Sequence, residues 1–414
     1  MKPLRGGLRL EGKKEASLIP WTIVRPSPPH RVRIPIRSLK NQKAKLFIQA
    51  GDRVRLGEKI AESEGTFPET IHASVSGKIS EIAPFPHPLL GEAEAIEIIS
   101  DGRDELVPEL GLERPHWESL NPSEVFHILR EAGVAGIPQS SSAVNALILN
   151  GCESEPYLTA DHSLMMSHPV EILKGGEILR RAFKAKELIV ALEDNKEEVA
   201  ELLKSKVFFH SWTQARIEVF PTRYPQGNAQ LLTQQLFGRE KIQAGVIPMS
   251  AAFAVYEAVV LQRPFFERAV TIAGECVIQP RNFWLRNGTL VEEAVKLARG
   301  FLRPPEKVIL GGPMAGIALA SLDVPILKET PAILGLPREV AKPETVEPCI
   351  RCGRCVESCP VEISPVLITL AAEKDLFELA EDYGASSCIE CGNCSYVCPA
   401  KRPMVELIQY ANAH

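Results

Sequence analysis

The sequence predicts a multidomain protein that combines α/β and β architecture with a mostly helical C-terminal domain. Residues 51–79 alternate apolar and polar positions between glycine-bearing turns, short apolar strands alternate with helical segments in the middle of the chain, and cysteines crowd the C-terminal end. At 414 residues the chain is long enough for about two to four domains of ordinary size. Each of these regions predicts a different kind of domain.

The amino-acid composition excludes several classes of function for this protein. With 45% hydrophobic residues, 24% charged residues and a formal net charge of -5, the chain resembles an ordinary globular protein and gives no reason to expect a nucleic acid as partner. No apolar run approaches the ~18 residues of a membrane span, and residues 1–20 lack the apolar core of a signal peptide. We therefore expect neither secretion nor membrane insertion.

The N-terminal region predicts β-hairpins. Residues 51–60 read Gly-Asp-x-Val-x-x-Gly and are followed by a second alternating stretch, 71–79. Both resemble the barrel-sandwich domains that carry lipoyl or biotinyl groups. The hairpin tip, residues 71–74, has no lysine to acylate, so we expect no swinging-arm role, and its lone His72 is assigned none.

The middle of the chain predicts an α/β sheet. Apolar strands are expected at 145–149 and 187–192, with a crossover helix within 164–186 and a further helix at 195–206. This alternation is typical of a largely parallel sheet, whose sites form at the carboxyl ends of the strands.

An acidic loop, residues 150–161, follows the first of these strands. Glu153 and Glu155 lie two residues apart beside a proline. Their carboxylates could accept hydrogen bonds from a ligand, or they could belong to a solvated acidic turn. The residue pattern alone leaves both interpretations open.

Eight of the ten cysteines form two copies of one pattern, C-x2-C-x2-C-x3-C-P. In bacterial ferredoxins this run wraps a [4Fe–4S] cluster, and in two-cluster ferredoxins the last cysteine of each run serves the other cluster. The sequence therefore predicts two closely spaced [4Fe–4S] clusters. The predicted ligands are Cys349, Cys352, Cys355 and Cys398 for one cluster, and Cys388, Cys391, Cys394 and Cys359 for the other.

A pair of zinc sites is the alternative interpretation of these cysteines. Zinc motifs usually supply ligands from separated cysteine pairs, so two triple runs that each end in Cys-Pro favour iron–sulfur clusters. Between the runs, residues 364–384 predict a helix with Ser364 at its N-cap and Gly384 as its stop. Cys152 and Cys276 lie outside the runs, and we expect no cluster role for them.

Several segments together resemble the C subunit of the Rnf electron-transport complex, which is similar to the flavoprotein subunit of respiratory complex I. The acidic loop matches the pattern N-x-x-E-C-E-P-Y-x-x-x-D, apart from the place of its cysteine. Further matching segments occur in order at 224–227, 268–274 and 311–316, and the resemblance covers nearly the whole chain.

The resemblance implies four domains. They are a barrel-sandwich hybrid (1–105), a complex I flavoprotein-like α/β domain that binds flavin and NADH (120–244), a β-grasp domain of the SLBB type (245–330), and a ferredoxin-like domain with two clusters (340–414). Implied cofactors are two [4Fe–4S] clusters and FMN, with NADH as substrate. The flavin-site residues that it implies are Glu153, Glu155 and Tyr157.

One loop departs from the family pattern. Where the family has a glycine-rich loop before the acidic loop, residues 132–144 of this chain lack the paired glycines. Three residues could donate hydroxyl hydrogen bonds to a phosphate instead, namely Ser140, Ser141 and Ser142. Two alternatives therefore stay open beside an NADH-oxidising subunit: an iron–sulfur relay or scaffold without flavin, and a protein similar to flavin-dependent cobalamin reductases.

The resemblance also implies partners and a location. They are the other subunits of a membrane electron-transport complex and a ferredoxin-like redox protein. The implied location is cytoplasmic, peripheral on the inner face of the cell membrane.

Overall fold

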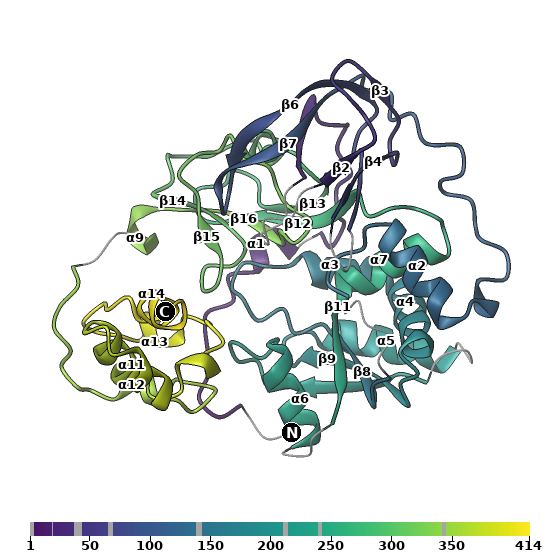
Figure 1. Cartoon of the computed structure of the whole chain (residues 1–414). Helices are drawn as coiled ribbons and strands as arrows, with labels where there is room; N and C mark the ends of the chain where they lie inside the picture. Colours follow the sequence, from purple (N-terminus) through teal and green to yellow (C-terminus); the bar gives the residue numbers. More distant parts are fainter. Residues whose placement is uncertain are drawn as a thin grey trace.

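The chain folds into four parts arranged around a central sheet (Figure 1). The structure, a computed structural model, describes residues 4–18, 20–36, 44–64, 69–137, 143–209, 214–238, 242–341 and 345–414. In Figure 1 the N-terminal β part lies at the top, the parallel sheet at the lower right, and the C-terminal helical domain, in yellow, at the lower left. None of the described helices is long and apolar enough to cross a membrane.

The N-terminal part is a sandwich of two antiparallel sheets. One has the order β1-β7-β6-β3 and the other β2-β4-β5. The strands are β1 (Arg31–Pro35), β2 (Ala44–Leu46), β3 (Arg53–Val54), β4 (Lys59–Ser63), β5 (Thr70–His72), β6 (Gly77–His87) and β7 (Gly91–Ser100). Ile60, Ile79 and Ile96 are fully buried between the sheets. Burial lowers the pKa of His72 to about 3, so this histidine is neutral in the interior.

A parallel sheet of order β10-β9-β8-β11 forms the α/β part. Its strands are β8 (Ala146–Asn150), β9 (Glu187–Glu193), β10 (Arg216–Phe220) and β11 (Ala244–Pro248), and its helices are α2 (Pro122–Glu131), α3 (Ala160–Ser167), α4 (Pro169–Ala182), α5 (Glu197–Phe209), α6 (Ala229–Phe237) and α7 (Met249–Val259). The predicted strands and the helix at 195–206 are present. Because β11 pairs with β8, this sheet extends past residue 244.

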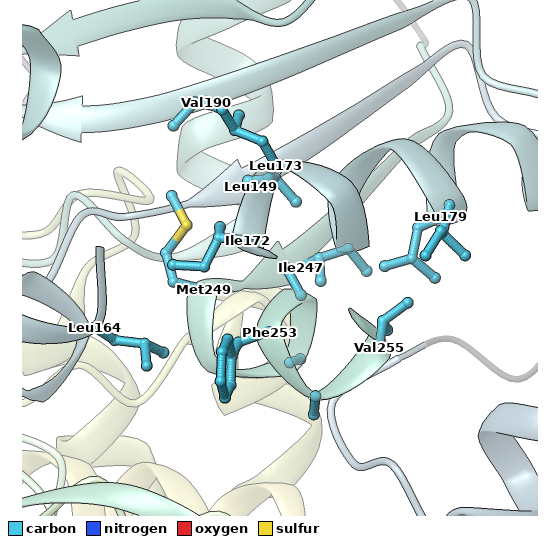
Figure 2. Close-up of a cluster of buried hydrophobic side chains, with 14 of the residues drawn as sticks. Leu149, Leu164, Ile172, Leu173, Leu179, Val190, Ile247, Met249, Phe253 and Val255 are labelled. Atoms are coloured by element: carbon cyan, nitrogen blue, oxygen red, sulfur yellow. The ribbon is translucent and has the colours of Figure 1, made fainter. Parts of the chain in front are cut away.

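The predicted single crossover helix within 164–186 is instead two helices, α3 and α4. They are separated at His168, whose φ of -132° is not helical. The cause is Pro169, because a proline disfavours helical geometry in the residue before it. Leu149, Leu173 and Met249 lie in the core that α4 and α7 form against the sheet (Figure 2).

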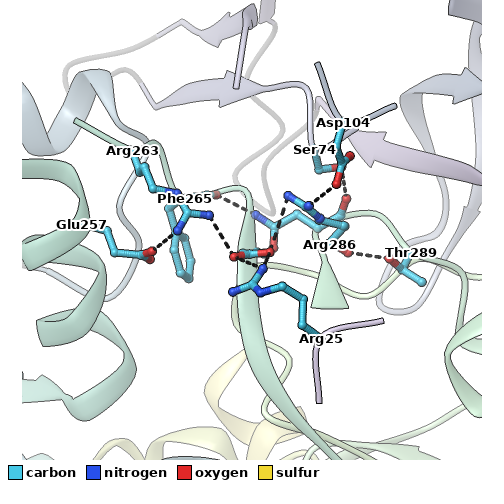
Figure 3. A network of polar contacts seen from close by, with 10 residues as sticks. Arg25, Ser74, Asp104, Glu257, Arg263, Phe265, Arg286 and Thr289 are labelled. Atoms are coloured by element: carbon cyan, nitrogen blue, oxygen red, sulfur yellow. Dashed lines mark hydrogen bonds and ion pairs between the residues drawn. The ribbon is translucent and has the colours of Figure 1, made fainter. Parts of the chain in front are cut away.

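The third part is a sheet of order β13-β12-β16-β14-β15. Its strands are β12 (Glu267–Ala273), β13 (Arg281–Arg286), β14 (Lys307–Leu310), β15 (Ile317–Ala318) and β16 (Ala332–Leu336), with α8 (Val291–Leu297) alongside. A polar network ties this sheet to the N-terminal part (Figure 3). The carboxylate of Glu267 accepts from Arg25 at 2.7 Å and Arg263 at 3.0 Å, while Arg286 binds Asp104 at 2.6 Å.

Short helices make up the C-terminal domain. They are α10 (Arg354–Glu357), α11 (Pro365–Ala372), α12 (Phe377–Asp382), α13 (Asn393–Tyr396) and α14 (Met404–Asn412). The helix expected over 364–384 is two helices, because the chain turns at Asp375 with a left-handed φ of 55°. Ser364 does hold the N-cap position of α11, although its side chain makes no capping hydrogen bond.

Candidate functional site

Two loops of the same shape carry most of the C-terminal cysteines. Each passes through a glycine with φ of 79°, Gly353 or Gly392, directly before a one-turn helix. The residue before the second cysteine is left-handed in both, with φ of 55° at Arg351 and 54° at Glu390. Its amide donates to the sulfur of the first cysteine over 3.4 Å in each case. We call residues 349–355 the outer loop and residues 388–394 the inner loop.

The structure brings thiols of the two runs together. Burial raises the pKa of Cys388, and the charge of Cys359, from the first run, raises it further. Burial also raises the pKa of Cys391 to about 11 and that of Cys394 to about 12, again with a contribution from Cys359. A cysteine of the first run thus lies beside the inner loop, which is the arrangement that crossed ligand sets require. The ligand assignment itself stays a prediction.

The arrangement of the thiols fits iron–sulfur clusters. Cys355, Cys394 and Cys398 pack in one buried group with Met404. Within the described ranges, no three His, Cys, Asp or Glu side chains converge on a point that would hold a single metal ion. A zinc site draws its sulfurs to about 2.3 Å from one ion, whereas a [4Fe–4S] cluster spreads its thiolates over four irons. A buried group of thiols from both runs is what two clusters with crossed ligands require.

The two loops differ in what surrounds them. A Cβ at Gly392 would lie 2.7 Å from the carbonyl oxygen of Met314, whereas nothing lies within 4 Å of the same position at Gly353. Asn393 is 1% exposed and donates to the Ser358 carbonyl at 3.2 Å. In the outer loop Ile350 is 66% exposed. The inner loop therefore packs against the body of the protein, and the outer loop faces solvent.

A cavity of about 310 Å³ lies between the inner loop and the α/β sheet. One wall is the acidic loop, which leaves the carboxyl end of β8, the edge at which open α/β sheets bind ligands. Tyr224 and Ala315 add to the lining, and residues 389–391 of the inner loop close it. Segments far apart in the sequence thus place the second cysteine run at the wall of a ligand-sized space.

Glu153 holds the acidic loop to the start of α3. Its two carboxylate oxygens accept from the amides of Asp161 at 2.9 Å and His162 at 3.4 Å. These are amides of the first turn of the helix, where an acidic group stabilises the helix end. Glu153 lines the cavity, but its carboxylate already has protein partners.

Glu155 joins the acidic loop to the turn after β14. Its carboxylate accepts from the amides of Met314 and Ala315, each at 3.0 Å. Burial raises its pKa, while these two amides act in the opposite direction. A side chain at Gly312 would collide with this carboxylate, which explains the glycine there. The glycine-rich segment 311–316 therefore makes a turn that binds Glu155.

Tyr157 is not among the residues that line the cavity. It has a left-handed φ of 68°, and its hydroxyl donates to Glu275 at 2.8 Å. Burial raises its pKa to about 12. Ser140, Ser141 and Ser142 lie outside the described residues.

The N-terminal segment is a part of the site that sequence reasoning missed. Residues 4–18, which we call the strap, run between the cluster domain and the α/β part (Figure 1). The Gly7 amide donates to the Ser358 carbonyl at 3.1 Å, and Leu8 exchanges two 2.8 Å backbone bonds with Tyr224. A Cβ at Gly6 would lie 2.5 Å from the Cys359 carbonyl oxygen. In the sequence, only the adjacent residues Gly6 and Gly7 indicated that another backbone could approach the strap so closely.

Two charged groups beside the cavity were also missed. Lys14, from the strap, donates to the carbonyls of Glu153 at 2.5 Å and Leu158 at 2.7 Å, and burial lowers its pKa to about 8. Asp161 lines the cavity, and burial, with the nearby charge of Glu153, raises its pKa to about 7. Asp161 is the last residue of the acidic-loop pattern but was given no role, and Lys14 lies in no local pattern that marks a site.

The cavity lies at the lower end of the size range of pockets that hold a ligand as large as a flavin. Pockets for ligands of that size span about 300–1,000 Å³ and combine apolar walls with a few polar groups. Here Leu158, Pro225 and Ile389 supply apolar wall, and Asp161 supplies a carboxylate. That carboxylate lies near the charges of Glu153 and Arg268.

Family models match along the chain. Residues 2–103 match the RnfC barrel sandwich hybrid domain, 132–261 the Nuo51 FMN-binding domain, 269–318 the SLBB domain, and 343–399 a 4Fe-4S dicluster domain. The order agrees with the order of the four parts of the structure.

Curated relatives match over most of the chain. The C subunit of a proton-translocating ferredoxin:NAD(+) oxidoreductase complex from Clostridium ljungdahlii is 36% identical over 99% of this chain and 93% of its own length. The Na(+)-translocating counterpart from Acetobacterium woodii is 33% identical over 88% and 86%. The C subunit of an ion-translocating oxidoreductase complex from Erwinia tasmaniensis is 35% identical over 80% of this chain but 43% of its own length.

A solved structure shows the same fold over much of the chain. It is an NAD+-reducing [NiFe]-hydrogenase in the air-oxidized state, with a TM-score of 0.50 and 16% identity. The match covers 71% of this chain and 64% of that one.

Proposed function

The chain belongs to the family of Rnf complex C subunits, and from that premise we propose that it carries electrons between a flavin cavity and a partner through two [4Fe–4S] clusters used in a fixed order. The observation that carries this proposal is the wall of the cavity. Cys391, a predicted ligand of one cluster, lines the cavity together with the acidic loop. A cluster bound there would be next to the cofactor, and the other cluster would be next to solvent.

The order of the clusters follows from burial. The inner loop, with Cys359 beside it, faces the cavity, whereas Cys352 of the outer loop is exposed. The inner cluster is therefore the one that exchanges electrons with the cofactor. The outer cluster is the one that a partner protein can approach.

FMN and [4Fe–4S] clusters are the cofactors of this chain, and NADH is its expected substrate. Bound FMN would accept two electrons together from NADH and release them singly to clusters that carry one each. The protein supplies position and electrostatics. Glu155 fixes the turn that contacts the inner loop, and Asp161 places an ionisable carboxylate at the cavity wall.

The strap holds the two ends of this path together. It contacts the peptide next to Cys359 and hydrogen-bonds to Tyr224, which lines the cavity. The ammonium group of its Lys14 donates to two backbone carbonyls of the acidic loop. We assign the strap the role of fixing the inner loop against the cavity.

The partners are other subunits of a multi-subunit Rnf-type complex and a ferredoxin-type protein. We place the chain at the surface of a membrane complex, on the inner, cytoplasmic face. The relatives' names, which describe ion translocation and reaction with ferredoxin and NAD(+), support this location.

A relay without flavin is the second candidate function. It is favoured by the loop at 132–144, which lacks the paired glycines of the family, and by Glu153 and Glu155, whose carboxylates bind backbone amides of the protein itself. In that case electrons would enter the inner cluster from another protein.

An absorption spectrum of the anaerobically purified chain, recorded before and after NADH addition, separates the two functions. The proposal predicts a flavin band near one per chain that bleaches with NADH, followed by reduction of the clusters. A chain that holds iron and sulfide but neither retains nor rebinds FMN would overturn the NADH–FMN part and leave the relay.

A further inference from the structure

A buried histidine lies between the cavity wall and the surface of the protein. His162, in the first turn of α3, has a side chain that is 3% exposed. Its Nε2 atom lies 3.0 Å from a carboxylate oxygen of Glu198 in α5, whose side chain is 43% exposed. The charge of Glu153, which lines the cavity, also acts on the imidazole. His162 therefore links a carboxylate at the cavity to a carboxylate in solvent.

The cavity wall carries two carboxylates that interact with each other. Glu153 and Asp161 both line the cavity, and Glu153 accepts from the amide of Asp161 at 2.9 Å. Burial and the charge of Glu153 raise the pKa of Asp161 to about 7. Two buried carboxylates that repel each other favour a state in which they hold one proton between them. Near neutral pH this pair can therefore take up or give up a proton at the cavity.

The imidazole of His162 is suited to passing a proton on. Burial lowers its pKa, while the charges of Glu153 and Glu198 raise it. A neutral imidazole has one nitrogen that accepts a proton and one that donates. Among the described residues Nε2 makes no regular hydrogen bond, and the Glu198 carboxylate is within reach of it. That nitrogen can therefore exchange a proton with Glu198.

Charged groups from several other elements surround the two carboxylates and the histidine. They are Lys14 of the strap, Glu155 of the acidic loop, Glu193 at the end of β9, Lys196 just before α5, Arg268 of β12 and Glu390 of the inner loop. The three cations lower the pKa of Asp161 against the effect of burial, which keeps it close to neutral pH. Lys196 also has its own buried partner, Glu193, at 3.3 Å.

Oxidation of NADH in the cavity would leave a proton there. The hydride that NADH gives up consists of two electrons and one proton. The two clusters take one electron each, and the proton stays behind. A cavity filled by cofactor and substrate excludes water, which would otherwise carry the proton away. The proton therefore needs a path through the protein.

We propose that Glu153 and Asp161 accept this proton, and that His162 and Glu198 pass it to solvent. The carboxylate pair gives a proton to one imidazole nitrogen while the other nitrogen gives one to Glu198, so the imidazole is neutral before and after. Glu198 then releases its proton to water. The proposal rests on the proposed NADH–FMN function and adds the residues that handle its proton.

The test follows the proton and the flavin in one reaction. The anaerobic chain, loaded with FMN, is mixed with NADH in weakly buffered solution in a stopped-flow instrument. Flavin absorption reports hydride transfer, and a pH-indicator dye reports proton release. The variants are Glu198→Gln and His162→Ala, and the control, Glu201→Gln, makes the same charge change at an exposed position about one turn further along α5.

We expect both variants to release the proton at least ~10-fold more slowly than wild type, since a positioned acid–base group contributes about 100–10,000-fold to a proton transfer. The first bleaching of the flavin band should keep its rate, because hydride transfer moves no free proton. Added imidazole should restore proton release in His162→Ala, a recovery that a purely structural role would not show. The Glu201 control should match wild type.

Proton release at the wild-type rate in Glu198→Gln, with normal flavin bleaching, would overturn the path and leave the NADH–FMN function intact. Equal slowing in Glu201→Gln would assign the effect to surface charge, and no rescue by imidazole in a His162→Ala chain with full iron and flavin would remove the imidazole from the path. Lost flavin in both variants would make the two residues structural. A wild-type chain that binds no FMN, or whose FMN is not bleached by NADH, would overturn the NADH–FMN function itself and the path with it.

Discussion

The inner and outer loops share one backbone and have different surroundings. Both hold a glycine at φ of 79° and a left-handed residue two positions earlier. The inner loop contacts Met314 and lines the cavity, whereas the outer loop has open space at the same glycine. The difference teaches that the duplicated run sets the local fold of a cluster site, and that the rest of the chain decides which cluster meets the cofactor.

The largest expected effect follows from the prediction that the last cysteine of each run binds the cluster of the other run. Cys359 lies in the first run but beside the inner loop, so Cys359→Ser should remove the inner cluster, lowering iron from about eight to about four per chain. NADH should then leave the outer cluster oxidised. Cys398→Ser should instead remove the outer cluster.

Iron analysis and EPR of both variants make this measurement, with Cys276→Ser as a control outside the runs. Cluster reduction by NADH that is equal in the Cys359 and Cys398 variants would contradict the assignment of the runs.

A second, smaller effect uses the two equivalent glycines. Alanine at either position strains a left-handed residue by about 1–2 kcal/mol. At Gly392 the new Cβ would also press on the Met314 carbonyl, while at Gly353 it would meet nothing. We therefore expect Gly392→Ala to slow reduction of the inner cluster by NADH, and Gly353→Ala to leave that rate unchanged.

Stopped-flow absorption with iron contents matched gives this comparison. Equal rates in the two variants would show that the contact with the 311–316 turn does not set the position of the inner loop.

The third prediction concerns Glu155, which binds that turn. Glu155→Gln replaces one acceptor oxygen with an NH2 group that faces a backbone amide, so the part-buried amide of Met314 or the exposed amide of Ala315 loses its charged acceptor, at a cost of about 1 kcal/mol. The melting temperature and flavin retention should both fall. Glu362→Gln, which breaks only an exposed ion pair with Arg5, should change little. An unchanged melting temperature in Glu155→Gln would refute the assigned contact.

The smallest expected effect is a pH dependence at the inner site. Folding lowers the pKa of Lys14 from 10.5 to about 8. Between these values the unfolded chain binds the proton and the folded chain does not, so Lys14 penalises folding below about pH 8 and the penalty is relieved as pH rises towards 10.5.

Denaturant unfolding of wild type and Lys14→Met tests this. The free energy of unfolding of wild type relative to Lys14→Met should rise by about 1–3 kcal/mol across that pH range. A difference that stays flat would mean that the Lys14 amine is not buried.

The sequence predicted features that local patterns determine. Both cysteine runs, the strands β8 and β9, and the helix α5 follow from spacing and apolar periodicity. Two predicted helices were each broken, at His168 by the following proline and at Asp375 by a left-handed turn. A period of apolar residues continues across such breaks, so periodicity alone does not reveal them.

The site could be predicted only in part. The residue pattern left the role of the acidic loop open, and the family resemblance implied a flavin site there. The loop does line the cavity, but the partner of each carboxylate depends on segments such as the 311–316 turn, about 160 residues away in the sequence. The strap was not predicted, because its contacts with Tyr224 and Ser358 are backbone bonds that any residue type could make.

The central claim is that electrons from the cofactor reach the inner cluster first. Rapid-freeze EPR of Cys352→Ser and Cys391→Ser after mixing with NADH tests it most directly, since each variant should keep one cluster. We predict that the cluster remaining in Cys352→Ser is reduced as fast as in wild type, and that the one remaining in Cys391→Ser stays oxidised on that timescale. Fast reduction of the cluster in Cys391→Ser would contradict the account.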